Sequence, residues 1–152
     1  MKLDIDGTKL EFEIRNYKPN CSTDDYGDNW CNVSLKVKNQ YLDYYKSGEI
    51  LECVDVDELL NLFEMLLNDE LEEPTTIGSV EPDIEFKLYP KFDVRENKNV
   101  LYVKKGHEIC DISVDMEIHF FLDGVLCGQF YTIALDRNDI KQFCKYLKQV
   151  TK

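Results

Sequence analysis

Apolar and polar residues alternate with a period of two in the first 17 residues of the chain. The stretch KLEFEIRNY (9–17) places Leu10, Phe12 and Ile14 on one face and charged side chains on the other. This pattern is typical of a strand that is buried on one side only. Residues 2–6 alternate in the same way, and Asp6-Gly7 between the two runs is a strong hairpin signal. The pattern therefore predicts two strands, 2–6 and 9–17, joined by a tight turn.

Two more strands are predicted after a loop over residues 18–29, which is rich in Pro, Gly, Asn and Asp. In WCNVSLKVK (30–38) apolar residues again occupy every second position, and Trp30, which opens the strand, is expected in the core. The stretch YLDYYKSGEILECV (41–54) continues as a strand, and a bulge near Ser47-Gly48 would fit the glycine there.

Two helices are predicted, over residues 55–69 and 136–150. Asp55 and Asp136 are natural N-caps, and an acidic residue follows each of them three positions later. Apolar residues recur at helical spacing in both segments. They are Leu59, Leu62, Phe63, Leu66 and Leu67 in the first helix, and Ile140, Phe143, Cys144, Leu147 and Val150 in the second.

Between the helices the chain again has the pattern of strands. EPDIEFKLYP (81–90) turns its apolar side chains inward, a short strand is expected near residues 99–104, and EICDISVDMEIHFFL (108–122) predicts a long one. Asp123-Gly124 then turns the chain into GQFYTIAL (128–135). Antiparallel runs followed by single helices predict an α+β fold, with meander sheets covered by helices on one face.

The two halves of the chain resemble each other. Residues 1–73 and 80–152 each end in a strand, a turn, a second strand and a capped helix, and Phe63 aligns with Phe143. This predicts two similar β–β–α units within one domain, residues 1–152. Because the identity is weak, a shared architecture could produce the same pattern without a duplication.

The charge of the chain is strongly acidic and unevenly placed. There are 30 Asp or Glu against 18 Lys or Arg, a net charge of −12. Residues 1–90 carry a net −13 and residues 91–152 a net +1. This balance argues against direct binding to nucleic acid or to anionic membranes, which require a basic surface. Solubility alone could explain the excess of acid, but its asymmetry favours one surface with an electrostatic role.

Neither export nor covalent cross-linking is indicated. The opening MKLDIDGTKLEFEI lacks the apolar run of a signal peptide, and no segment approaches the roughly 18 apolar residues of a membrane helix. We therefore expect a cytoplasmic protein. The six cysteines are widely spaced, without any C-x-x-C pair, and are predicted to be free structural thiols. They are Cys21, Cys31, Cys53, Cys110, Cys127 and Cys144.

The sequence contains no motif for catalysis or for cofactor binding. His107 falls in a turn and His119 in a strand, and neither lies beside a nucleophile motif. No glycine-rich phosphate loop occurs. We therefore predict no catalytic residue, no cofactor and no metal site, although the carboxylates of residues 24–28 could hold a cation loosely.

Acidic residues cluster in three places that we predict to contact a protein partner. At a helix C-terminus carboxylates oppose the helix dipole, and residues that cost stability where they lie suggest a function. Tyr26 could serve as an aromatic anchor among them. The predicted contact residues are Asp24, Asp25, Tyr26 and Asp28 in the first loop, Asp69, Glu70, Glu72 and Glu73 after the first helix, and Glu81 and Asp83 before the next strand.

The last helix has the opposite charge. Lys141, Lys145 and Lys148 recur at helical spacing, with Lys152 beyond them. Such a stripe is usually a solvated face, but it could pair with an acidic patch of a second copy. We therefore expect a monomer or a weak homodimer.

The order of the motifs resembles the WapI family of bacterial immunity proteins, the partners of wall-associated contact-dependent toxins. The matching motifs are Asp28-Asn29-Trp30 with Val33, Glu58-Leu59 with Leu62, and Glu81-Pro82 with Ile84 and Phe86, where Ile84 replaces the usual Leu. The resemblance implies a non-enzymatic protein that binds and inhibits a cognate toxin domain. Many such toxins are basic nucleases, which an acidic inhibitor suits. The resemblance carries no contact residue over to this chain.

Two other functions remain open at this point. A small regulatory domain with another protein partner would have the same composition. An enzyme with an unrecognised carboxylate site would instead require a deep pocket lined by acids with perturbed pKa values.

Overall fold

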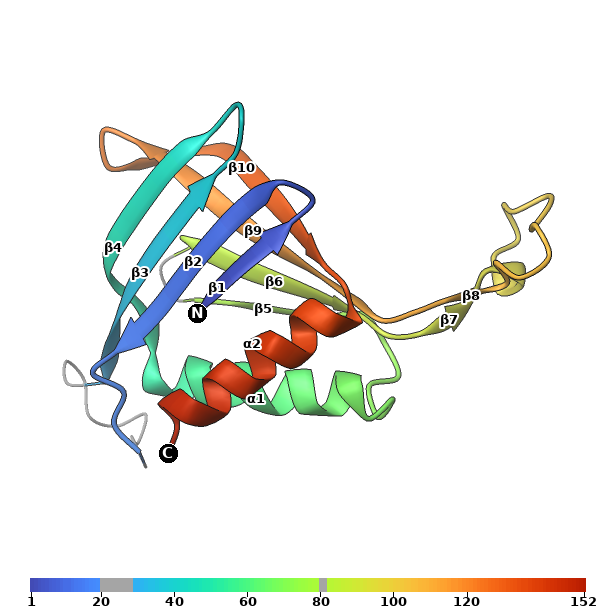
Figure 1. The fold of residues 1–152 in the computed structure, drawn as a ribbon, viewed down its shortest axis with the longest axis horizontal. Helices are drawn as coiled ribbons and strands as arrows, with labels where there is room; N and C mark the ends of the chain where they lie inside the picture. Colours follow the sequence, from blue (N-terminus) through green and yellow to red (C-terminus); the bar gives the residue numbers. More distant parts are fainter. Residues whose placement is uncertain (20–28, 80–81) are drawn as a thin grey trace.

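Two four-stranded antiparallel sheets and two helices form the body of the protein (Figure 1). The structure is a computed structural model, and it describes residues 1–19, 29–79 and 82–152. The predicted α+β class is confirmed.

The first sheet is a meander in the order β1-β2-β3-β4. Its strands are β1 (Lys2–Ile5), β2 (Thr8–Arg15), β3 (Trp30–Lys38) and β4 (Asp43–Glu52). The inward face of β2 is buried, as the alternation predicted. The bulge predicted in β4 is confirmed two residues beyond Ser47-Gly48, because Cys31 pairs with Leu51 and Asn32 with Glu49, which leaves Ile50 as the extra residue. Trp30 is only half-buried, on the same face as Asn32, and so differs from the expected core residue.

Helix α1 (Cys53–Leu67) begins two residues earlier than predicted. Glu52, and not Asp55, is the N-cap, while the Asp55 carboxylate accepts a hydrogen bond from the Glu52 amide at 2.8 Å. Glu52 and Asp55 lie within one turn, and an acidic side chain at either position stabilises the N-terminus of a helix. The earlier start adds Cys53, which is buried, to the core face of the helix.

The second sheet has the order β10-β9-β6-β5. Its strands are β5 (Thr75–Gly78), β6 (Ile84–Tyr89), β9 (Ser113–Leu122) and β10 (Val125–Leu135). The turn predicted at Asp123-Gly124 is confirmed, and both residues have positive φ, 50° and 77°. This conformation explains why Asp and Gly are suited to the turn.

The strand predicted near residues 99–104 is wrong. These residues lie in a long loop, and the chain around them forms a projecting arm. The arm contains the two-residue strands β7 (Phe92–Asp93) and β8 (Ile109–Cys110) and a short 3-10 turn, η1 (Val94–Glu96). NVLYVK has strand-forming residues, but a strand persists only where another strand pairs with it.

Helix α2 (Arg137–Val150) closes the fold. The predicted cap is confirmed, since the Asp136 carboxylate accepts hydrogen bonds from the amides of Asn138 and Asp139 at 2.7 and 2.9 Å. Figure 1 shows that both helices lie side by side across one end of the two sheets. If the two short strands of the arm are left aside, each half of the chain runs through four strands and then a helix.

The core fills the space between the sheets and the helices. Four fully buried phenylalanines meet at its centre with ring centroids 5.2–6.0 Å apart, a spacing typical of favourable aromatic pairs. They are Phe12, Phe63, Phe86 and Phe143. The described cysteines are free thiols, and Cys21 lies outside the described residues. Within the described part of the chain, no helix is long and apolar enough to span a membrane.

Candidate functional site

Residues 47–86 form an acid-only segment, with 13 Asp or Glu and no Lys or Arg. The segment runs from the end of β4 through α1 and β5 into β6. No counter-charge can come from within it, so each cation that neutralises one of its acids comes from another part of the chain. The candidate site is the stretch of this segment directly after α1, residues 69–73, where four exposed acids gather.

The C-terminus of α1 places the predicted acids of residues 69–73. The Glu70 amide donates to the Met65 carbonyl at 2.8 Å and the Asp69 amide to the Leu66 carbonyl at 3.3 Å. This is the Schellman arrangement, in which the residue after the cap takes a left-handed conformation. Asp69 occupies that position with φ 57°, where glycine is the usual residue. The last turn of α1 contains no basic residue.

Arg137, the first residue of α2, supplies the missing positive charge. Its guanidinium donates to the Leu67 carbonyl and to the Asp69 carboxylate, both at 3.4 Å. It also forms a bidentate ion pair with Asp111, in which Nε donates to Oδ2 at 2.9 Å and Nη2 donates to Oδ1 at 2.7 Å. This pair lowers the pKa of Asp111 to about 2. Arg137 therefore joins the end of α1, the start of α2 and the base of the arm.

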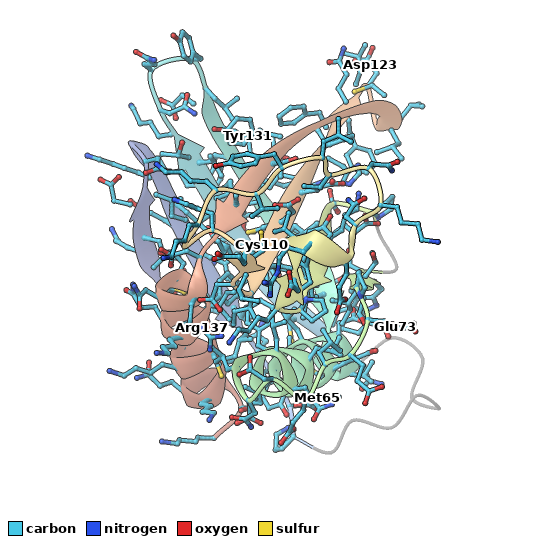
Figure 2. All side chains as sticks on the ribbon, turned by 90° about the vertical axis from the view of Figure 1, so that its right-hand side faces the viewer. Met65, Glu73, Cys110, Asp123, Tyr131 and Arg137 are labelled. Atoms are coloured by element: carbon cyan, nitrogen blue, oxygen red, sulfur yellow. The ribbon has the colours of Figure 1, made fainter. Side chains whose placement is uncertain are left out.

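Beyond Asp69, the acidic residues are free. Glu70, Glu72 and Glu73 are exposed, and their carboxylates have no ion-pair partner among the described residues. We call Asp69, Glu70, Glu72 and Glu73 the acidic corner. In Figure 2, which looks onto the end of the molecule that carries the arm, Glu73 and Arg137 lie on opposite sides of Cys110. One of the three predicted clusters is therefore exposed at this end of the molecule.

Asp83 is buried and so differs from the accessible contact residue that the sequence predicted. It is only 6% exposed and forms an ion pair with Lys46 of β4. The Lys46 ammonium also lies 4.3 Å from the centre of the Phe121 ring. Asp83 therefore links the two sheets, and its charge is already paired. The other predicted contact residues, Asp24, Asp25, Tyr26, Asp28 and Glu81, lie outside the described residues.

The outer face of the second sheet carries a charged cluster that the sequence analysis missed. Ligand atoms of Glu85, Glu117 and His119 lie within 4.8 Å of one another, a donor set that suits a transition metal. The Lys87 ammonium, however, contacts Glu117 at 2.8 Å and Glu85 at 3.5 Å. The chain thus supplies its own cation here, although His119 Nε2 is buried and has no hydrogen-bond partner among the described residues. Glu85 and Glu117 lie directly opposite each other in the β6–β9 pair, a register that the sequence alone does not display.

A groove of about 610 Å³ lies between the first sheet and α2 and contains two acids, Glu11 and Glu13. Both are paired, Glu11 with Lys2 at 3.2 Å and Glu13 with Arg15 at 3.8 Å. Burial raises the pKa of two aspartates, Asp55 and Asp139, but both serve as helix-capping side chains.

Comparison with known proteins identifies the family of the chain. The family model described as the Immunity protein WapI-like family matches residues 2–152. The chain belongs to this family. No curated protein and no solved structure matches the chain.

The family motifs take structural positions in this chain. Leu59 is buried in α1, and Ile84 and Phe86 are buried in β6. Trp30 begins β3. These motif residues therefore help to build the core and the strands of the fold.

Proposed function

We propose that this protein binds a cognate toxin domain in the cytoplasm of the bacterium that makes it, and blocks the toxin without a catalytic step of its own. Membership of the WapI-like immunity family supports the class of partner. The net charge of the chain, −12, supports a basic toxin as the partner, since a surface of carboxylates complements a basic protein. A nuclease-type toxin fits best, because enzymes that hold nucleic acid present basic clefts.

The observation that carries this proposal is the set of unpaired carboxylates at Glu70, Glu72 and Glu73. The neighbouring acids Glu64 and Asp69 already have cationic partners within the chain, Lys148 and Arg137. An exposed group of like charges repels itself, and a basic partner relieves this repulsion. Complementary charge mainly accelerates encounter, so the corner is expected to control the association rate.

The test is binding to a catalytically inactive form of the toxin domain encoded beside this protein. Titration calorimetry should show one-to-one binding, and kinetics at 50 and 500 mM salt should show association slowing by more than about tenfold. The triple variant Glu70→Lys, Glu72→Lys and Glu73→Lys should lose most of this salt dependence. Absence of binding at either salt concentration, or binding that salt does not affect, would contradict the proposal.

A matched control reverses three exposed acids of the first sheet, Asp4, Glu13 and Glu49. It changes the net charge by the same amount, so it separates the acidic corner from the total charge. Association of this control variant should stay within about threefold of the wild type. Reversal of Asp24, Asp25 and Asp28 tests the predicted loop surface, and an unchanged affinity would remove that loop from the interface.

A further inference from the structure

The arm, residues 91–110, projects far from the rest of the molecule (Figure 1). Its two strands are joined by only two residue pairs, Phe92 with Cys110 and Asp93 with Ile109. The Val94 amide adds one hydrogen bond to the Glu108 carbonyl at 2.8 Å. A two-stranded ribbon this short is marginal in water by itself. Its extended position is therefore one that contact with another surface would stabilise.

The tip of the arm exposes large apolar side chains. Leu101 is 99% exposed and Tyr102 is 83% exposed. Farther down the arm, Phe92 and Ile109 are about half-exposed. Apolar groups gathered on a protrusion are typical of a contact surface, and a tyrosine at its end is a common anchor of protein interfaces.

The charge of the arm is opposite to that of the rest of the chain. Residues 91–110 contain five Lys or Arg and three Asp or Glu, a net charge of +2, which leaves −14 for the remainder. At the tip, residues 97–107 contain three lysines, Lys98, Lys104 and Lys105, and no carboxylate. A surface that complements the tip is therefore both acidic and able to cover apolar side chains.

The base of the arm is fixed beside the acidic corner. Asp111, directly after β8, is paired with Arg137, and Arg137 also contacts Asp69 of the acidic corner. The arm and the acidic corner consequently lie at the same end of the molecule, as the view in Figure 2 shows. In a single copy the tip points away from this corner (Figure 1).

We propose that the arm docks on a second copy of this chain, in a two-fold symmetric dimer with exchanged arms. A two-fold axis that brings the arm-bearing ends of two copies face to face directs each tip toward the acidic corner of the other copy. Lys98, Lys104 and Lys105 then meet Glu70, Glu72 and Glu73, while Leu101 and Tyr102 become buried. The same contact forms twice, so the assembly closes at two copies.

The dimer does not depend on the toxin proposal, although both assign a role to the acidic corner. A basic toxin and the arm of a second copy cannot occupy that corner together. Toxin binding would then compete with dimerisation.

Analytical ultracentrifugation of the full chain tests the dimer directly. The wild type should dimerise at 50 mM salt, and its dissociation constant should rise at least tenfold at 500 mM salt or in the variant Leu101→Ser with Tyr102→Ser. Tyr41→Ser with Leu122→Ser is the matched control, because these side chains are 88% and 69% exposed but lie outside the arm. This control should dimerise like the wild type.

A charge exchange makes the test specific for the proposed contact. The variant with Lys98, Lys104 and Lys105 all changed to Glu should be monomeric, and so should the variant with Glu70, Glu72 and Glu73 all changed to Lys. Mixed together, the two should form a heterodimer, since both of its contacts then join opposite charges. Circular dichroism checks that each variant is folded.

Several results would overturn the proposal. The wild type could remain monomeric at 50 mM salt throughout the micromolar range. It could dimerise equally well with the arm variants, or the charge-exchanged pair could fail to associate. Loss of toxin binding in a monomeric Leu101→Ser, Tyr102→Ser variant, where the wild type is also monomeric, would assign the arm to the toxin instead.

Discussion

The ring of Phe63 in α1 packs edge to face on the ring of Phe143 in α2, with centroids 5.5 Å apart and planes inclined at 71°. Both side chains are fully buried. They also occupy matching positions when the two halves of the sequence are aligned. The contact joins the two helices, and each ring also packs on Phe86 of the second sheet.

Replacement of either ring by alanine should therefore destabilise the whole fold. Phe63→Ala or Phe143→Ala is expected to lower the free energy of unfolding by about 3–5 kcal/mol, because a cavity remains in the core. Urea denaturation followed by circular dichroism measures this loss. Phe92→Ala removes a half-exposed ring from the arm and is the matched control. A cost above about 1 kcal/mol for this control would contradict the assignment of the core.

The ion pair between Lys46 and Asp83 offers a second test. Asp83 is 6% exposed, so Lys46→Met leaves a buried carboxylate without its cation and should cost about 3–5 kcal/mol in urea denaturation. The double variant Lys46→Met with Asp83→Asn should recover part of the loss. Lys38→Met breaks the exposed pair with Asp43 and should cost about 1 kcal/mol or less. Equal losses at Lys46 and Lys38 would show that Asp83 is solvated.

The pair between Arg137 and Asp111 predicts how stability depends on pH. The pKa of Asp111 falls from its ordinary 3.8 to about 2 in the folded protein because Arg137 bonds its carboxylate. A lowered pKa stabilises the fold above the ordinary value, and this contribution disappears as the pH falls from about 4 to about 2. The exposed position of Asp111 limits the effect to about 1 kcal/mol.

Asp111→Asn removes this contribution at neutral pH. The variant should be less stable than the wild type in urea at pH 6, and the difference should vanish near pH 2. Asp4→Asn changes an exposed aspartate of β1 and serves as the control, with no difference expected at either pH. A difference between Asp111→Asn and wild type that persists at pH 2 would attribute the loss to packing.

The N-cap of α2 gives a prediction about local structure. Asp136→Ala removes the acceptor for the amides of Asn138 and Asp139 and should cost about 1 kcal/mol. Asp136→Asn keeps an acceptor oxygen and should retain most of the stability. The midpoint of urea denaturation distinguishes the two. Equal losses would mean that the negative charge at the helix N-terminus matters more than the hydrogen bonds.

The elements that could be predicted are those set by neighbours in the sequence. The buried face of β2, the turn at Asp123-Gly124 and the cap of α2 all follow from residues within a few positions of one another. The start of α1 was displaced because Glu52 and Asp55 can both serve its first turn. The strand near residues 99–104 was wrong because its pattern is local, whereas pairing requires a second strand.

The candidate site was predicted less completely, since charge alone does not say which acids are paired. Glu70, Glu72 and Glu73 are exposed as expected, whereas Asp69 is held by Arg137 and Asp83 by Lys46. These pairs join residues 68 and 37 positions apart. Separations of this length have no pattern that a single sequence can display.

The sequence by itself determined the α+β class, the faces that enter the core, and the concentration of negative charge in the first 90 residues. It could do so because periodicity and composition are properties of the chain alone. Only the tertiary structure decided that the arm carries a basic, apolar tip away from the body, and that Arg137 fixes its base beside the acidic corner. The physical reason is that burial and ion pairing depend on which distant segments meet, and packing of the two sheets and two helices settles that.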